Sequence, residues 1–445
     1  MPAPTVITDT ELTGLLKNVY SQFREKVQNL VTPLLAQLQT AKAGGPRNMR
    51  WGGQGVYFDV VVGRPAGAVF SSGGYFPADT TATEKQANVG VVRAYTTRQI
   101  DGLAFAGTRS KEAAFETIAK KTMEEIREAS AQLMQQALHN KPDGVMALIT
   151  GSPASPTNTF DVTSPYGISG AGQGGLLLTI GDSIAVLDGS NAIRSGSRVQ
   201  ITNITNSGDT ATLTVSANIS SLAASDKIIK ITSNASDSYP TGGNAMNGLI
   251  NITNRGNAAA YQSLHGLSNA TYAIWDAVRM TAGTDTPDAN QPTESDIWDL
   301  IQLIAARSGK DASKRPQELL LMTTPGIAKN LMESMVAQRR FTANEIATTI
   351  KGGYRAVEIC GIPCVTDPYV PAGTIYLLHI PSLSWVDAKD WGYVEFEGAG
   401  PWRWLQGRDA FETTYSWYGN LACLQRNAHG SIVGYTDTKR YTHVV

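Results

Sequence analysis

The chain has 445 residues, of which 42% are hydrophobic and 17% are charged, and its formal net charge at pH 7 is −1. A length of this order accommodates two or three domains with a sizeable core. The near-zero charge excludes a global basic field for tight nucleic-acid binding, and no window approaches the roughly 20 apolar residues of a membrane span. The low charged fraction suits either a surface covered by other copies of the chain or a Ser/Thr/Gly-rich β protein.

The cysteine content indicates the redox compartment in which the chain is made. Cys360, Cys364 and Cys423 are too few for a disulfide scaffold and odd in number. The N-terminal residues show no basic start followed by an apolar run, so we expect no secretory signal. We therefore expect synthesis in a reducing cytosol, with Cys360 and Cys364 on or beside a strand.

Residues 9–39 carry apolar side chains at three- and four-residue steps, which predicts a helix. Pro33 should kink or divide it, and Gly44, Gly45 and Pro46 should end it. This segment is interpreted either as a helical arm docked on an apolar surface or as a first core helix.

Two strand candidates follow, over residues 56–62 and 88–100, joined by a Gly-rich segment with aromatic side chains. A two-stranded hairpin is marginal in water by itself, so this loop should need a partner surface. The candidate assembly-interface residues in and around it are Trp51, Tyr57, Phe58, Arg64, Phe70, Tyr75, Phe76, Lys85 and Arg93.

The clearest helix is predicted over residues 110–139, with Ser110 or Thr108 as its cap and residues 141–144 (KPDG) as its stop. At about 1.5 Å per residue this helix would be roughly 45 Å long. That length suits a spine across a flat subunit.

The residue pattern changes over residues 149–254, where short β-like runs alternate with turns rich in Gly, Asn, Asp and Ser. The spacing predicts a small antiparallel sheet or barrel. The predicted strands cover residues 176–180, 198–204, 211–215 and 227–231.

Mixed α/β patterning returns after residue 261. Helices are predicted from about 294 to 308 and from Pro325 onward, because each begins with a capping residue or proline before an apolar periodic run. Further strands are predicted at 319–322, 362–367 and 373–379, and the last quarter is rich in strands and tryptophan.

Candidate chemical sites do not assemble into a motif. The Gly-rich run 170–175 lacks the strand, helix and spacing of a dinucleotide loop. The five histidines and the Cys360/Cys364 pair lack metal-ligand spacing. The tryptophans from Trp385 to Trp417 could stack bases or sugars, but packing under a sheet or at a subunit contact is favoured. We therefore expect no enzyme activity, no catalytic residues, no cofactor and no metal.

The segment order resembles that of tailed-bacteriophage major capsid proteins, whose fold is shared with encapsulins and the floor of herpesvirus capsids. The resemblance covers nearly the whole chain and rests on the arm, loop and long helix in sequence. Four sequence segments add to the resemblance: 261–267 (YQSLHGL) followed by Trp275, 319–325 (LLLMTTP), 361–368 (GIPCVTDP), and the run from 408–412 (RDAFE) to Gly430.

The resemblance implies an α+β fold with an N-terminal arm, an extended β-hairpin loop, a long spine helix, peripheral and axial domains, and a small all-β insertion domain. The helical arm would occupy residues 1–48, the extended loop 49–105, and the peripheral domain with its spine helix 106–148. The β-rich insertion would occupy 149–256, the axial domain 257–404, and C-terminal strands returning to the peripheral domain 405–445.

The implied function is that of a major capsid protein of a tailed double-stranded DNA bacteriophage, assembling as pentamers and hexamers into an icosahedral head shell. Expected partners are other copies of the chain, portal, scaffolding and decoration proteins, and packaged DNA contacted non-specifically, with no membrane. The protein would be located in the virion head after assembly in the host cytoplasm. Alternatives are an encapsulin-like nanocompartment shell, another virion part from the tail or decoration, and a carbohydrate-acting enzyme or lectin.

Overall fold

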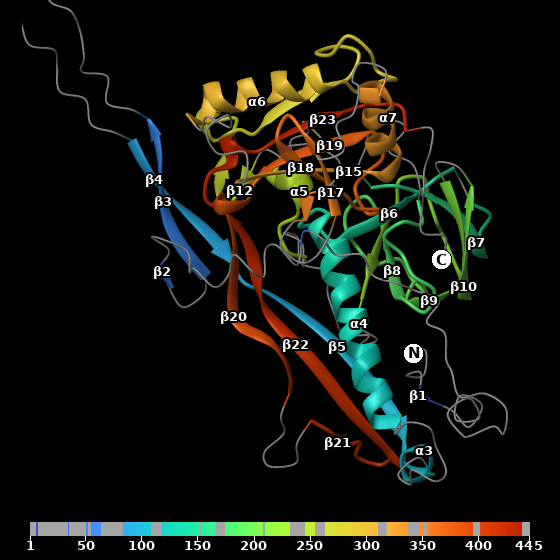
Figure 1. The fold of residues 1–445 in the computed structure, drawn as a ribbon. Coiled ribbons are helices and arrows are strands. Elements are labelled where there is room, and N and C mark those ends of the chain that lie inside the picture. The colour runs from blue at the N-terminus through green and yellow to red at the C-terminus, as the bar shows by residue number, and fades with distance from the viewer. Residues whose placement is uncertain are drawn as a thin grey trace, which may run out of the picture.

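A computed structural model describes residues 6–7, 34, 50–51, 55–63, 83–107, 118–151, 153–165, 174–207, 210–231, 245–253, 263–309, 318–336, 348–349, 355–394 and 401–437. Its strands form a long sheet, a seven-stranded sheet, a closed barrel, a three-stranded hairpin unit and the small pair β12 (Ser263–Leu264) and β13 (Leu267–Ser268) (Figure 1). No helix within these ranges is long and apolar enough to cross a membrane.

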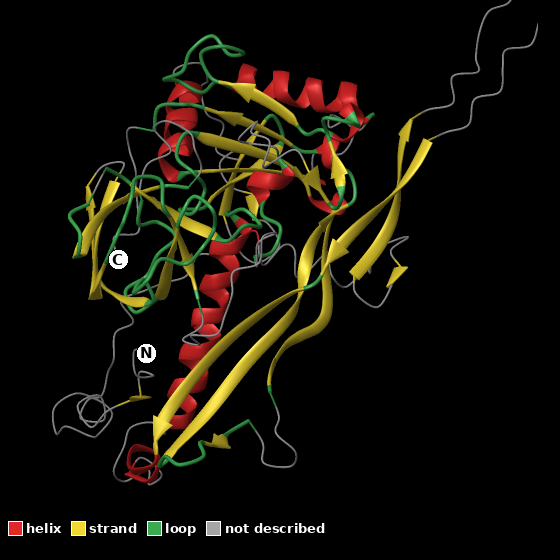
Figure 2. Ribbon diagram, turned by 180° about the vertical axis from the view of Figure 1, so that it is seen from behind, coloured by secondary structure: helices red, strands yellow, loops and turns green. Residues whose placement is uncertain are grey.

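The long sheet and one long helix form the elongated half of the molecule. The helix α4 (Ile118–Leu138) runs along one face of the sheet (Figure 2). Thr96 Oγ1 lies 3.0 Å from Ser130 Oγ, and the Tyr393 hydroxyl donates to the Met123 carbonyl at 3.1 Å. The sheet has the order β1-β5-β22-β20, with β21 beside β22: β1 (Val6–Ile7), β5 (Val92–Asp101), β20 (Leu383–Tyr393), β21 (Arg403–Trp404) and β22 (Ala410–Cys423).

The spine helix is confirmed where the structure describes it. The predicted start near Ser110 lies outside the described residues, and the helix ends at Leu138, one residue before the predicted end. The short helix α3 (Gly102–Gly107) follows β5 at the far end of the sheet.

The seven-stranded sheet forms the other large unit. Its order is β14-β23-β19-β15-β18-β17-β16: β14 (Val278–Thr281), β15 (Leu319–Thr323), β16 (Thr348–Thr349), β17 (Arg355–Ile359), β18 (Ile362–Thr366), β19 (Thr374–His379) and β23 (Gly430–Val433). Alternate residues of β15 enter two cores, with Leu321 under the helices and Leu320 on the opposite face. Both faces of this sheet are therefore buried.

Two helices cover one face of that sheet. The helix α6 (Glu294–Ser308) begins with a capping box between Thr293 and Asp296 and ends at Gly309 in the left-handed conformation, as the sequence predicts. The helix α7 (Pro325–Val336) begins at the predicted proline. Ile297 and Ile304 of α6 and Leu331 of α7 lie in the same core cluster as Ile375.

The region after α4 is a closed barrel, one of the two predicted alternatives. The strand order is β10-β7-β6-β11-β8-β9: β6 (Val145–Ile149), β7 (Thr157–Thr163), β8 (Ser183–Leu187), β9 (Val199–Ser207), β10 (Thr210–Ile219) and β11 (Lys227–Lys230). The strand predicted at residues 176–180 was wrong, because this segment is a turn whose Leu177 and Leu178 enter the barrel core. An apolar run of this length signals burial without specifying a strand.

The pairing of strands differs from the predicted division of the chain at two places. Residues of β20 were assigned to the axial unit, yet β20 pairs with β22 in the long sheet, and β23, assigned to the returning strands, lies in the seven-stranded sheet. The barrel also begins at Val145, before the predicted boundary at 149. Partners this distant in sequence leave no local signal, because a strand pattern specifies which face is buried and not which strand lies beside it.

The predicted loop contains β3 (Gly55–Gly63) and β4 (Thr83–Gly90), with β2 (Arg50–Trp51) on the other side of β3. The predicted return strand at 88–100 was wrong in its extent. The strand that pairs with β3 is β4, and after one residue the chain continues as β5 in the long sheet. The helical arm predicted at 9–39 lies outside the described residues except Leu34, which is helical and buried.

Candidate assembly surfaces

The hairpin of β3 and β4 has two halves with different surroundings. Val56 pairs with Val89, and Phe58 pairs with Ala87, and all four side chains are buried in the central core of their own chain. Beyond this base the strands project away from the two sheets (Figure 1).

The outer half of the hairpin is exposed. Val61 is 53% exposed, and it lies opposite Glu84, which is also exposed. Asp59 and Lys85 are exposed as well. The base therefore fixes the direction of the hairpin, while the outer half offers a mixed surface of apolar and charged side chains.

His265 fixes the hairpin to the rest of the chain. Its carbonyl accepts a hydrogen bond from the Asn88 N–H of β4 at 2.9 Å, and its ring stands edge-on to Phe58 of β3 with centroids 5.9 Å apart. Its Nε2 accepts from the Cys423 N–H, the last residue of β22, at 2.9 Å. One residue thus contacts both strands of the hairpin and the end of the long sheet.

The environment of His265 keeps it neutral. Burial, together with the nearby Arg426 guanidinium, lowers the pKa of His265 to about 3. The bond from Cys423 requires an unprotonated Nε2, so Nδ1 carries the ring proton. His265 also has φ of +55°, in the two-residue turn between β12 and β13.

The sequence-predicted interface residues differ in their surroundings. Trp51 lies in β2 opposite Val56, Tyr57 is half-buried on β3, and Lys85 and Arg93 are exposed. Phe58 was expected at an interface, but it is buried in its own chain because its side chain points to the core face of β3. Arg64, Phe70, Tyr75 and Phe76 lie outside the described residues.

Arg93 belongs to a group on the face of the long sheet opposite α4. The guanidinium of Arg93 and the ammonium of Lys389 lie 5.7 Å and 5.4 Å from the Tyr418 ring centroid. The Tyr95 hydroxyl donates to the Tyr418 hydroxyl at 3.2 Å. This face therefore presents two cations and two phenols to its surroundings.

The tryptophans divide into packed and exposed residues. Trp391 stacks on Tyr415 and Trp417, with centroids 5.1 Å and 6.0 Å apart, and Trp385 lies 5.2 Å from Trp417. Trp417 Nε1–H donates to Asp387 Oδ1 at 2.5 Å. Trp404, in contrast, is exposed at the far end of the long sheet. The sequence did not distinguish it from the packed tryptophans, because an exposed and a buried position on a short strand share the same local pattern.

The described residues offer no assembled chemical centre. Within them, no group of three or more His, Cys, Asp or Glu side chains is placed to hold a metal ion. Burial raises the pKa of the Cys364 and Cys423 thiols to about 12, which makes them poor nucleophiles at neutral pH.

The fold is that of a phage capsid subunit. The Cyanophage A-1(L) capsid asymmetric unit matches with a TM-score of 0.56 at 12% identity, over 96% of this chain and 99% of that one. The capsid of a native GTA particle matches with a TM-score of 0.45 at 8% identity, over 94% of this chain and 95% of that one. The structure from Gordonia phage Cozz has a TM-score of 0.44 at 12% identity, over 97% and 95%. The predicted fold class is confirmed by the first match.

No protein-family model matches the chain, and no curated protein matches its sequence. The likeness is therefore one of architecture. It covers nearly the whole length of each chain.

Proposed function

We propose that this protein is the major capsid protein of a tailed double-stranded DNA bacteriophage, and that copies of it form pentamers and hexamers of an icosahedral head shell. The observation that carries the proposal is the match to a phage capsid subunit over 96% of this chain and 99% of that one. A net charge of −1 supports it, because many copies can pack without strong mutual repulsion.

The hairpin is the proposed contact with a neighbouring copy. Its base is part of the chain's own core, and its outer half presents Val61, Asp59, Glu84 and Lys85. Covering a neighbour would remove the apolar part of this surface from water and pair its charges. Closed symmetry then multiplies contacts that are individually weak.

The proposal also covers the partners and the location of the protein. Portal, scaffolding and decoration proteins would be further partners, and packaged DNA would be contacted without sequence preference. The mature protein would reside in the virion head after assembly in the host cytoplasm. We propose that the protein has a structural role and catalyses no reaction.

Electron microscopy of the purified full chain tests the function. The expected result is closed shells of uniform diameter, or free pentamers and hexamers. A monomer that persists to high protein concentration would contradict the proposal.

A shortened hairpin tests the role of its outer half. Replacing residues 61–84 by Asn-Gly leaves the pair Val60 and Lys85 on either side of a tight two-residue turn and keeps the buried base. This variant should retain the far-UV circular dichroism of the parent and form no shells. Normal shells would show that the outer half is dispensable.

A further inference from the structure

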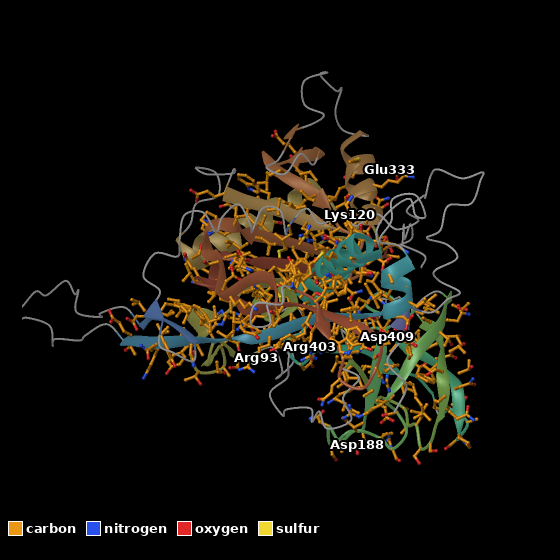
Figure 3. All side chains as sticks on the ribbon, turned by 90° about the horizontal axis from the view of Figure 1, so that it is seen from below. Arg93, Lys120, Asp188, Glu333, Arg403 and Asp409 are labelled. Atoms are coloured by element: carbon orange, nitrogen blue, oxygen red, sulfur yellow. The ribbon has the colours of Figure 1, made fainter. Side chains whose placement is uncertain are left out.

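The barrel is joined to the rest of the chain by connections that lie side by side. The chain enters it after α4 through a turn in which Gly144 has φ of +72°, and beyond the barrel the Ala245 N–H donates to the Pro142 carbonyl at 3.2 Å. Figure 3 shows the barrel, on which Asp188 is labelled, lying to one side of the two sheets. Connections gathered at one point act as a hinge unless other contacts hold the barrel in place.

The contacts between the barrel and the spine helix are polar. Among the described elements, the barrel strands contact chiefly one another. Gln132 Nε2 of α4 donates to Thr179 Oγ1 at 2.9 Å, and Lys230 Nζ donates to Gln136 Oε1 of α4 at 2.7 Å. Such hydrogen bonds contribute little net free energy, because water replaces them when the contact opens. An interface that is neither large nor apolar allows two units of one chain to move relative to each other.

Tyr369 adds an apolar contact at this junction. The core of the barrel includes two side chains from elsewhere in the chain, Tyr369, which follows β18, and Ile250 of the short helix α5 (Leu249–Ile252). Tyr369 is 7% exposed, and its hydroxyl interacts with the side chains of Gln132 and Gln136. A buried tyrosine ring removes a large apolar area from water. Tyr369 and Ile250 therefore supply an apolar part of a contact that is otherwise polar.

Asp367 fixes Tyr369 to the spine helix and the seven-stranded sheet. The Tyr369 N–H donates to Asp367 Oδ1 at 2.9 Å. The same carboxylate accepts from Gln135 Nε2 of α4 at 3.2 Å, and its Oδ2 lies 3.2 Å from Nε2 of His139. The Asp367 N–H donates to the Thr323 carbonyl of β15 at 3.0 Å. Tyr369 therefore stays with the helix and the sheet when the barrel moves, and its ring must then leave the barrel core.

We infer that Tyr369 is a latch, which holds the barrel against the spine helix and the seven-stranded sheet and whose release lets the barrel move as one body about the connections at residues 142–145 and 245. The ring is buried in the closed arrangement and exposed in the open one, so its burial favours the closed arrangement. The inference concerns the single chain and does not depend on the proposed self-assembly.

Distances between spin labels test the movement directly. Lys120→Cys places a label on the spine helix, and Ser190→Cys places one in an exposed turn of the barrel. The matched control joins Lys120→Cys to Glu333→Cys on α7, and Figure 3 labels both of these positions. The full chain carries Cys360→Ser in every case, because the other two native cysteines are buried. The first pair reports the barrel against the spine, and the control pair reports the seven-stranded sheet against the spine.

Removal of the ring should move the barrel alone. Tyr369→Ala should give the first pair a second, shifted distance in double electron–electron resonance and leave the control pair at the parent distance. Tyr369→Phe keeps the ring, so it should match the parent in both pairs. A Tyr369→Ala protein whose first pair keeps the parent distance would overturn the inference. Equal changes in both pairs would also overturn it, because they would show a loss of order throughout the chain.

Thiol labelling tests the latch with Tyr369 intact, in case Tyr369→Ala does not fold. Ile250→Cys places a thiol at the contact, and the fully buried Cys423 in the central core is the internal reference. In urea below the main unfolding transition, the thiol at residue 250 should be labelled at least about tenfold faster than Cys423, because the barrel opens before the rest of the chain unfolds. Equal rates at the two positions, resolved by peptide mass spectrometry, would overturn the inference.

Discussion

His265 Nε2 accepts a hydrogen bond from the backbone N–H of Cys423 at 2.9 Å, and this contact joins the base of the hairpin to the end of the longest strand. The acceptor must be a neutral imidazole, so the joint depends on protonation. The direction of the hairpin is therefore connected to a titratable group deep in the core.

Acid should weaken this joint. The pKa of His265 is lowered to about 3 in the folded chain from 6.5, so between pH 6.5 and 3 the unfolded chain binds a proton that the native chain does not. The stability that neutral His265 contributes is complete above pH 6.5 and is lost as the pH falls toward 3, by up to about 1.4 kcal/mol per pH unit. His429, whose pKa is lowered to about 3 by burial, His379 and Arg426, should act in the same direction.

The variant His265→Asn isolates the contribution of this residue. Asn tolerates the positive φ of this position, so the backbone is not strained further. We expect a loss of about 2 kcal/mol at pH 7.5, from the missing hydrogen bond and the space left by the ring. The urea midpoint of the variant should also fall less between pH 7 and 4 than that of the parent. Parallel pH profiles would contradict the assignment of the joint to His265.

Arg426 should be needed for folding, because its guanidinium supports two backbone carbonyls in the core. Its guanidinium is fully buried and donates to the Asn251 carbonyl at 2.7 Å and the Ile252 carbonyl at 3.2 Å. These carbonyls belong to the short helix α5 (Leu249–Ile252). Arg426→Met would leave both without these donors, at a cost of about 1–3 kcal/mol for each. Urea unfolding at pH 7.5 would measure the loss.

The variant Arg426→Met should also raise the pKa of His265. Removing the positive charge of Arg426 removes one cause of the lowered pKa of His265, so that pKa should rise toward 6.5. The pH profile of Arg426→Met should therefore be shallower than that of the parent. A steeper profile would show that the two groups are not coupled as described.

Gly248 should tolerate no side chain, because it fixes α5 against the end of the spine helix. A Cβ at this position would lie 1.9 Å from the Asn140 carbonyl oxygen and 2.8 Å from that of Ala137. Gly248→Ala should therefore destabilise the fold by about 2–4 kcal/mol, within the range for overpacking and backbone displacement. Gly189→Ala is the control, since no heavy atom lies within 4 Å of its added Cβ. Thermal melts of the two variants should differ by many degrees.

The elements predicted well from sequence are those whose ends are specified locally. Thr293 and Asp296 form the capping box of α6, Gly309 ends it, and the apolar positions between them follow one face. The order of arm, loop and spine, together with four short segments of similar sequence, also predicted the fold class, which the match to a capsid subunit confirms.

The features that sequence reasoning missed depend on distant partners. The sequence does not predict the structural role of His265, because nothing in its local sequence shows that Phe58 and Cys423 converge on it. The aromatic and β-branched run of β3 suggested an exposed interface, whereas alternate residues of it enter the core. Its alternation with exposed Asp59 and Val61 was the available signal.

Neighbouring positions of β3 should separate folding from assembly. Phe58→Ala removes a buried ring from the central core, so it should lower the free energy of unfolding by about 3–5 kcal/mol. Val61→Asp changes a side chain that is 53% exposed, so stability should change by less than about 0.5 kcal/mol. If the outer hairpin covers a neighbouring copy, the same aspartate is carried into an apolar contact, and its desolvation opposes assembly.

Sedimentation of the two variants over a concentration series provides the measurement. Val61→Asp should remain folded by circular dichroism and require at least tenfold more protein to form large assemblies. Phe58→Ala should show its defect first in the melting temperature. A Val61→Asp protein that assembles at the parent's concentration would locate the contact surface elsewhere, because a buried carboxylate at an interface cannot be neutral in its effect.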